Sequence, residues 1–260
     1  MAVTNLNNFV IDRVLRGIAL SHTDGSVLFS INQITNPSLN CSSESTDAVD
    51  ALGTPIATFY RAKNAEFSAE NAIFDMNLMA VQLGTTKKEA ASDKKIVAPA
   101  FEIIDVTAEK TATLKHTPKG ELKTLYKLNG DSTLGAAYGK ATDAAADKFA
   151  LTGTALKLPT GLAEGDQVIA IYEYEAEKGI AVVNSANNFP TGCKFVMEVL
   201  GCDVCDQTNL IYAYLVFPNF KISPDFDWSI ATDGTHPFSG KAMQDYCSKD
   251  NKLFEIIIPE

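Results

Sequence analysis

Residues 192–260 read GCKFVMEVLGCDVCDQTNLIYAYLVFPNFKISPDFDWSIATDGTHPFSGKAMQDYCSKDNKLFEIIIPE, and this C-terminal third decides the expected fold. Its runs KFVMEVLG (194–201) and NLIYAYLVF (209–217) are rich in β-branched and aromatic residues, which favours strands. The second run is apolar on both faces, as in a strand that is covered on both sides. The run LFEIII (253–258) predicts a closing strand. The end of the chain therefore predicts a sheet.

Residues 225–232, DFDWSIAT, alternate strictly between apolar and polar side chains. This period of two is typical of a strand that packs on one side only. We expect Phe226, Trp228 and Ile230 to face a core. The opposite face would then carry Asp225, Asp227 and Ser229.

A short helix is expected directly after this strand. Ser239 can accept hydrogen bonds from the first turn, and Ala242/Tyr246 and Met243/Cys247 are spaced four residues apart on one apolar stripe. Such a helix would lie against the sheet to bury that stripe.

The composition excludes several classes of protein. The chain has 260 residues, a net charge of −10 and a pI near 4.8, which argues against a nucleic-acid binder because few cations are available to neutralise phosphate. No apolar run reaches the ~18 residues that a membrane span requires, and the N-terminus lacks the layout of a signal peptide. We therefore expect the protein in a cytoplasm, or in an assembly that is built there.

The first 95 residues have a mixed pattern. The run VIDRVLRGIAL (10–20) has helix-like apolar spacing, although Gly17 interrupts it. The polar segment 40–55 predicts a long loop that has a role in assembly, or equally an ordinary mobile loop. Asp75 can cap a helix over 76–83, with Gly84 placed to end it.

Residues 96–190 differ in sequence pattern from both flanking segments. Six short β-rich runs follow one another with turns between them, which suits a small antiparallel sandwich of immunoglobulin-like type. The flanking segments are each too short to close a core alone. The sequence therefore predicts one β domain formed by residues 1–95 and 191–260, with residues 96–190 inserted into it.

No catalytic or metal-binding motif stands out. Cys202 and Cys205 form a C-x-x-C pair, but the histidines and other cysteines are scattered, so we predict no metal and no cofactor. A hydrolase that uses Cys202, Cys205 and His236 is the enzymatic alternative. We expect that the protein is not an enzyme.

Two acidic strand faces are the most suggestive surface feature. Glu66, Ser68 and Glu70 alternate with apolar residues, as do Asp225, Asp227 and Ser229. Each is explained by an ordinary wet sheet face. If the two strands pair, however, they form one negative surface along which DNA can slide without adhesion. Lys87 and Lys88 begin a small basic cluster with Lys94 and Lys95, which fits a solvated loop or a contact with an acidic neighbouring subunit.

The stretches DALGTPIATFYRAKNAEFSAENAIFDMNLMAVQLGT (50–85) and LVFPNFKISPDFDWSIATDGTHPFSGKAMQDYCSKDNKLFEIIIP (215–259) resemble the phage tail tube, or major tail, proteins. The resemblance covers roughly 1–95 and 191–260. It implies a mainly β subunit, a sandwich or barrel with a flanking short helix, that forms rings, commonly of six, which stack into a tube that conducts DNA. An N-terminal arm and a long loop often mediate stacking in such proteins, and residues 1–20 and 40–51 occupy those places here.

These observations lead to a functional hypothesis. We expect a virion protein of the tail, assembled in the host cytoplasm, whose partners are copies of itself and other tail proteins, with DNA as a passing cargo. The expected inter-subunit residues are Val10, Val14, Asp47, Asp50, Lys87 and Lys88. The main rival is a capsid decoration or fibre protein in which the inserted domain binds a surface glycan.

Overall fold

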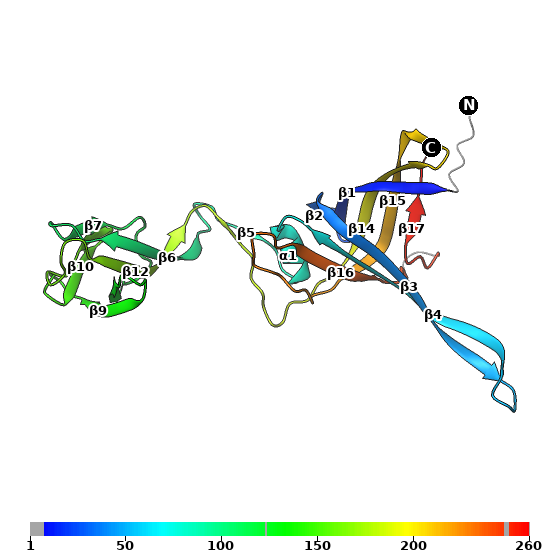
Figure 1. The fold of residues 1–260 in the computed structure, drawn as a ribbon, viewed down its shortest axis with the longest axis horizontal. Helices are drawn as coiled ribbons and strands as arrows, with labels where there is room; N and C mark the ends of the chain where they lie inside the picture. Colours follow the sequence, from blue (N-terminus) through cyan, green and yellow to red (C-terminus); the bar gives the residue numbers. More distant parts are fainter. Residues whose placement is uncertain (1–7, 123, 247–249, 260) are drawn as a thin grey trace. The chain divides into compact units, whose positions relative to one another are not determined.

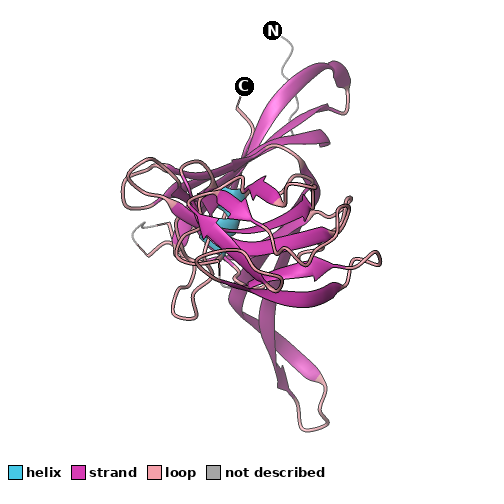
Figure 2. Cartoon of the chain, turned by 90° about the vertical axis from the view of Figure 1, so that its left-hand side faces the viewer, coloured by secondary structure: helices cyan, strands magenta, loops and turns pink. Residues whose placement is uncertain are grey.

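The computed structural model describes residues 8–122, 124–246 and 250–259. The chain divides into two compact units, each of which is described by itself. Unit 1 consists of Met1–Lys87 and Val182–Glu260, and unit 2 is the uninterrupted segment Lys88–Ala181 between them. The sequence places the limits of the inserted segment at 96 and 190. Strands dominate both units, and the described residues contain one short helix (Figures 1 and 2).

Unit 1 is built on one curled sheet in the order β2-β1-β14-β15-β16-β4-β3, with β17 paired to β15. Its strands are β1 (Phe9–Ser21), β2 (Val27–Ile31), β3 (Ile34–Val49), β4 (Pro55–Asn71), β14 (Gly192–Asp203), β15 (Asp206–Ile222), β16 (His236–Ala242) and β17 (Glu255–Ile257). All its pairings are antiparallel. The C-terminal strands β14, β15 and β16 thus lie between two pairs of N-terminal strands, β2-β1 and β4-β3.

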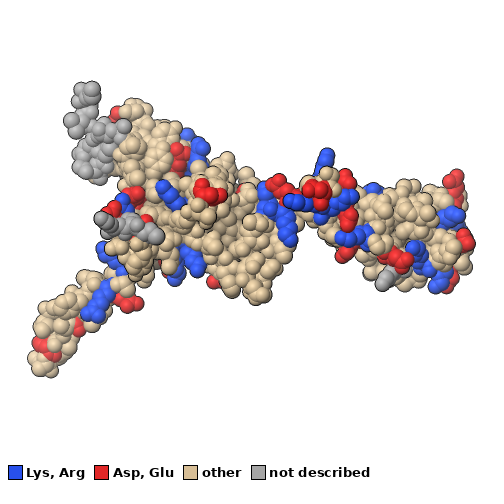
Figure 3. Space-filling model, turned by 180° about the vertical axis from the view of Figure 1, so that it is seen from behind, with Lys and Arg blue, Asp and Glu red and all other residues tan. Residues whose placement is uncertain are grey.

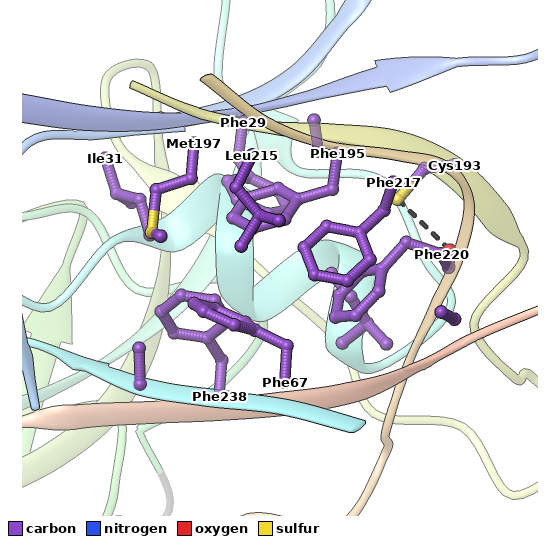
Figure 4. Close-up of a cluster of buried hydrophobic side chains, with 14 of the residues drawn as sticks. Phe29, Ile31, Phe67, Cys193, Phe195, Met197, Leu215, Phe217, Phe220 and Phe238 are labelled. Carbon is purple, nitrogen blue, oxygen red and sulfur yellow. Dashed lines mark hydrogen bonds between the residues drawn. The ribbon is translucent and has the colours of Figure 1, made fainter. Parts of the chain in front are cut away.

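A cluster of phenylalanines fills the inside of this curled sheet (Figure 4). Its members are at most 2 % exposed, and they are Phe29, Phe67, Phe195, Phe217, Phe220 and Phe238. The ring centroid of Phe195 lies 5.3 Å from that of Phe220 and 5.7 Å from that of Phe67. Aromatic rings at such distances gain contact energy beyond the area that they bury. This cluster joins the N-terminal and C-terminal halves of unit 1.

Glycine allows β15 and β16 to approach each other beside this cluster. A Cβ atom on Gly240 would lie 2.4 Å from Cζ of Phe220 and 2.6 Å from the carbonyl oxygen of Lys221. Because no side chain fits there, only glycine permits the short pairing between the two strands.

The single helix, α1 (Met76–Gln82), confirms the capped helix that the sequence predicts. The Asp75 carboxylate accepts hydrogen bonds from the backbone N–H groups of Asn77 and Leu78, and Gly84 follows the helix with a φ of +63°. Leu78, Met79 and Ala80 are buried, and Leu78 belongs to the phenylalanine cluster. The helix therefore covers part of the core.

Unit 2 has its own sheet and its own core. The sheet runs β6-β12-β8-β9-β10-β11-β7, and β5 and β13 pair separately at the two ends of the unit. Its strands are β5 (Lys88–Glu89), β6 (Ile96–Asp105), β7 (Thr111–Thr113), β8 (Thr124–Leu128), β9 (Leu134–Lys140), β10 (Lys148–Thr152), β11 (Ala155–Lys157), β12 (Gln167–Ala176) and β13 (Ile180–Ala181). Its core includes Leu125, Phe149 and Val168, which are fully buried. That unit 2 is immunoglobulin-like stays a prediction.

Two segments near the N-terminus differ from the sequence-based expectation. Residues 10–20 form β1 rather than a helix, because two register shifts along β14, at Ile11/Arg13 and Val14/Arg16, break the period of two and imitate helical spacing. Residues 40–49 continue β3 rather than a loop, because they pair with β4 residue by residue. Water reaches both faces of this pair, so the apolar alternation of a strand is missing.

The C-terminal third also holds two corrections. Residues 225–232 are not a strand but part of the connection between β15 and β16, and β4 pairs with β3 and β16 instead. Residues 239–242 are strand rather than helix, because β16 pairs with β4 along its length and with the end of β15. Tertiary pairing overrides the local helical pattern there. Cys247, which the expected helix includes, lies outside the described residues. The strand expected over 253–258 is present as β17.

We predict that Phe195→Ala lowers the free energy of unfolding of unit 1 by about 3–5 kcal/mol, because a large cavity would remain among buried rings. Denaturant titration followed by the fluorescence of Trp228, the only tryptophan, measures this in unit 1. Phe189→Ala is the matched control, because the Phe189 side chain is 67 % exposed. Equal stability of the two variants would contradict the role of the cluster.

Candidate assembly surfaces

The most exposed apolar surface of unit 1 lies on the arm, defined here as residues 42–61 of the β3–β4 hairpin. β16 pairs with β4 only over Glu66–Asn71, so the arm is two-stranded and extends beyond the rest of the sheet (Figure 1). Its exposed large side chains are Val49 (53 %), Leu52 (91 %), Ile56 (70 %), Phe59 (55 %) and Tyr60 (72 %). The surface of the arm is mostly uncharged (Figure 3). An exposed apolar surface of this kind marks an interaction site.

The two expected contact residues on the arm, Asp47 and Asp50, have local partners. Asp50 Oδ1 accepts hydrogen bonds from the N–H groups of Leu52 and Thr54, both at 2.8 Å, and so shapes the turn. Asp47 accepts a hydrogen bond from the Thr58 hydroxyl across the two strands at 2.7 Å. These carboxylates hold the arm in shape, and the apolar side chains beside them make the exposed surface. The loop expected over 40–55 hid Val49 and Leu52, and no local pattern marks Ile56, Phe59 and Tyr60 as exposed.

A second apolar surface is the groove where the core of unit 1 opens. It has a volume of about 260 Å³ and almost entirely apolar walls from β1, β3, β4, β14, β15 and β17. Ile11 and Ile256 on its rim are 63 % and 64 % exposed. Of the expected contact residues, Val14 lines the groove, and Val10 lies nearby on β1, 47 % exposed. The groove is therefore part of the core that the subunit itself leaves uncovered.

The polar face of β4 is present as expected. Ala65, Phe67 and Ala69 are buried, whereas Glu66 and Ser68 are exposed and Glu70 is half-buried. Glu66 forms an ion pair with Lys241 at 2.8 Å, which the register of β4 and β16 brings opposite. This ion pair makes the face less negative than its carboxylates alone suggest.

The structure places only one of the other expected residues beside this face. Ser68, Glu70 and Asp225 line the same shallow hollow of about 200 Å³. Asp227 and Ser229 are exposed in the connection between β15 and β16. The six residues thus do not form one strand-paired surface, although Asp225 and Phe226 of the connection line the hollow together with residues of β4.

Aromatic stacking fixes the connection between β15 and β16. The rings of Trp228 and Phe74 stack at 4.3 Å, and Phe74 in turn stacks on His236 at 4.8 Å. Phe226 approaches the same imidazole at 6.2 Å. The connection that carries Asp225, Asp227 and Ser229 is therefore anchored to the end of β4 and to β16.

His236 is fully buried at the centre of this anchor. Its Nδ1 accepts a hydrogen bond from the N–H of Asp75 at 3.3 Å, so Nε2 donates to Oε1 of Gln82 at 2.7 Å. Gln82 donates in turn to the carbonyl of Pro237 at 3.0 Å. Burial lowers the pKa of His236, and the nearby Asp75 carboxylate opposes this in part. The neutral imidazole is thus a structural link between α1 and β16, which no sequence motif indicates.

Lys87 ends the first segment of unit 1, and the other lysines of the basic cluster lie at the start of unit 2. Lys88 opens β5 and pairs with Ala181 of β13, and Lys95 forms an ion pair with Glu177 at 3.1 Å. Lys87 is half-buried and has a partner in the chain. The expected contact between these lysines and a neighbouring subunit stays a prediction.

The residues of the hydrolase alternative do not come together. Cys202 lies in β14 and Cys205 in the turn to β15, whereas His236 begins β16 and its ring nitrogens are engaged with Asp75 and Gln82. Among the described residues, no group of three or more His, Cys, Asp and Glu side chains could hold a metal ion. The described part of the chain likewise includes no helix with the length and apolarity that crossing a bilayer requires.

Comparison with known proteins adds one finding. The model of a family described as the YomU/Tube protein family matches residues 9–256, which is nearly the whole chain. No curated protein matches the sequence at the significance required.

We predict that acid destabilises unit 1 through His236. Burial lowers the pKa of His236 in the folded state. The stability that the neutral imidazole contributes is therefore fully present above the ordinary pKa of 6.5 and is lost as the pH falls through the folded pKa. His236→Asn is expected to remove this part of the pH dependence. Denaturant midpoints by Trp228 fluorescence, at about pH 7.5 and about pH 5, measure it. The exposed His22→Asn is the control and should behave as the wild type, and equal acid sensitivity in both variants would refute the assignment.

Proposed function

The chain belongs to the YomU/Tube protein family, and from this premise we propose that it is a phage tail tube subunit. In this proposal it assembles with copies of itself into rings that stack around a passage for DNA. Family membership is the observation that carries the proposal. The uncovered apolar surfaces of unit 1 support it, because a structural subunit of this kind works by association.

The arm supports association most directly. An isolated two-stranded hairpin is marginally stable in water, and this one exposes several large apolar side chains. A neighbouring copy that covers Leu52, Ile56 and Phe59 would both stabilise the arm and gain binding energy. We infer that the arm is an inter-subunit element and that Asp47 and Asp50 contribute by keeping its shape.

The groove supplies a matching surface of the same apolar character. Arm and groove are different surfaces of one chain, so a contact between the arm of one copy and the groove of the next is head-to-tail. Contacts of that kind generate rings when the rotation closes and open filaments when it does not. In this assembly Val10 and Val14 of β1 lie at the contact, and Lys87 and Lys88 offer cations to acidic neighbours.

The passage for DNA is assigned to the polar side of unit 1. Most of the net negative charge of the chain lies in unit 1. We infer that Glu66, Ser68 and Glu70 on β4, with Asp225, Asp227 and Ser229 on the connection after β15, face the passage. A polar surface with excess carboxylates repels phosphate and so does not retain DNA. Glu66 is the weakest member of the set, because Lys241 pairs with it.

Such a protein acts through its surfaces rather than through catalysis. Its place is the virion tail, after assembly in the host cytoplasm, and its other partners are the tail proteins at the two ends of the tube. A capsid decoration or fibre protein is the rival, and negative-stain microscopy of the purified chain separates the two. Rings or hollow tubes of even bore support the proposal, whereas solid fibres or lone subunits refute it.

We predict that Leu52→Asp on the arm weakens assembly, because it places an uncompensated charge in an apolar contact. The concentration at which tubes form should rise by about thirtyfold or more, as for the loss of a contact worth ~2 kcal/mol. Light scattering and microscopy measure it. Val183→Asp is the control, since Val183 is exposed but lies outside the arm. Unchanged assembly of the Leu52 variant would exclude the arm from the contact.

A second prediction locates the passage. In a chain with its other cysteines replaced by serine, Asp227→Cys should react with a maleimide on a long polyethylene glycol chain as a free subunit but not within tubes. N-ethylmaleimide should modify it in both states, because a small reagent enters a water-filled passage but not a buried contact. Lys157→Cys in unit 2 is the control and should react in both states. Equal reaction of Asp227→Cys with the large reagent in tubes would place it outside.

A further inference from the structure

Unit 2 carries a polar hollow that the proposed assembly does not use. Its volume of about 520 Å³ lies within the range of ~300–1,000 Å³ that is typical of small-molecule sites. One wall is the segment 115–119 between β7 and β8, and the other is the end of β12 with Tyr174, Glu175 and Glu177. All of these residues belong to unit 2, so the hollow is complete within that unit.

A stacked pair of rings forms the apolar part of the hollow. The imidazole of His116 lies parallel to the phenol ring of Tyr174, with centroids 3.8 Å apart and planes 6° from parallel. His116 is exposed, and the described residues place no second ring on it. The pair therefore presents a flat π surface to the solvent, which suits the C–H face of a pyranose ring.

Buried polar groups hold the segment 115–119 in place. The carboxylate of Glu102, only 7 % exposed, accepts hydrogen bonds from the N–H of Lys115 at 2.9 and 3.1 Å and from the hydroxyl of Tyr172. The Tyr172 hydroxyl accepts a hydrogen bond from the N–H of His116 at 3.2 Å. Burial and Glu102 raise the pKa of Tyr172 to about 12, so the phenol stays a donor to the carboxylate.

The Glu102 carboxylate fixes the backbone of one wall of the hollow. A buried carboxylate is costly unless it is fully hydrogen-bonded, and here it orders the backbone of the segment that lines the hollow. The backbone N–H of Lys119 also donates to the carbonyl of Glu173 on β12. The hollow is thus formed before any ligand arrives, which reduces the ordering cost of binding.

The charges at the hollow favour an anion. Lys119 pairs with Glu175 and Lys95 pairs with Glu177, each at 3.1 Å, and these exposed pairs keep spare donors and acceptors. Among the described residues, the ammonium group of Lys115 has no ion pair. Lys115, His116 and Thr117 all line the hollow. The Lys115 ammonium group is therefore available to bind an anion in a hollow that also has polar groups for hydroxyl ligands.

We propose that this hollow binds an acidic saccharide. The sugar ring stacks on His116 over Tyr174, and its carboxylate or phosphate group meets Lys115. The hydroxyl groups of the sugar exchange hydrogen bonds with Thr117 and with the carboxylates of Glu175 and Glu177. Glu102 and Tyr172 do not touch the ligand and are positioning residues. The inference does not depend on tube assembly, although a tube would display many copies of the site and multiply its avidity.

Binding of the full chain to immobilised oligosaccharides tests the proposal. The probes are a hyaluronate tetrasaccharide, a sialylated trisaccharide and a glucose 1-phosphate conjugate, with chitotetraose as the neutral match. At least one acidic probe should bind, and chitotetraose should bind at least about tenfold more weakly, as expected for the loss of one charge-assisted hydrogen bond. If inorganic phosphate alone abolishes binding of the acidic probe, the hollow is a simple anion site and the saccharide assignment is overturned.

Variants identify the site. Lys115→Ala should weaken binding of the acidic probe about tenfold, and His116→Ala should weaken it by a similar factor, as lost ring contacts do. Lys157→Ala, which removes an exposed lysine elsewhere in unit 2, is the control. Tubes should still form in all three variants, so failure here is distinguishable from failure of the proposed assembly.

Tyr172→Phe tests the positioning role. Loss of the hydroxyl should speed hydrogen exchange at the His116 amide and weaken binding, while Lys115→Ala should weaken binding without faster exchange. The proposal is overturned if no acidic probe binds above the level of Lys115→Ala, if chitotetraose binds equally well, or if Lys157→Ala has the same effect as Lys115→Ala.

Discussion

The packing of Phe67 on the phenylalanines of the C-terminal strands is the contact on which unit 1 depends. Phe67 comes from β4, and its ring lies between 5.7 and 6.4 Å from those of Phe195, Phe217, Phe220 and Phe238. Neither end of the chain can bury its own aromatic residues alone. The whole of unit 2 intervenes in the sequence, so this contact brings together strands that are far apart along the chain and commits them to one curled sheet.

The same cluster explains where unit 1 remains exposed. Its rings fill the middle of the curled sheet, but the sheet is longer than the cluster. At one end the inner face continues as the apolar groove, and beyond another edge β3 and β4 run on as the two-stranded arm. In a protein that works as a monomer, a shorter arm and a covered groove would leave less apolar surface in contact with water. Retaining them is understandable when a second copy covers them, since exposed edges and apolar faces promote association.

The residues themselves show how far the sequence could predict this structure. Features set by neighbours along the chain were predictable, including the Asp75-capped helix, the polar face of β4 and the strand β17. The errors arose where distant pairing decides. Register shifts hid β1, and solvent on both faces hid the arm. Residues 239–242 have a helix-like pattern but form part of β16, because β4 and β15 pair with it. The strict alternation of residues 225–232 indicated one buried face, but Trp228 and Ile230 are 42 % and 85 % exposed, and aromatic stacking on Phe74 and His236 holds the connection without strand pairing.

The candidate surfaces follow the same division between local and distant effects. The sequence predicts that Glu70 and Asp225 lie on polar faces. It does not predict that they line the same hollow, because only the folded chain brings them together. The hollow of unit 2 depends on Glu102 and Tyr172, which have no motif and acquire their role only when β6 and β12 pair. The cores of the two units share no buried residue, so a change within the unit 2 hollow leaves the phenylalanine cluster intact. The proposed association of unit 1 and the proposed ligand site of unit 2 therefore rest on separate cores.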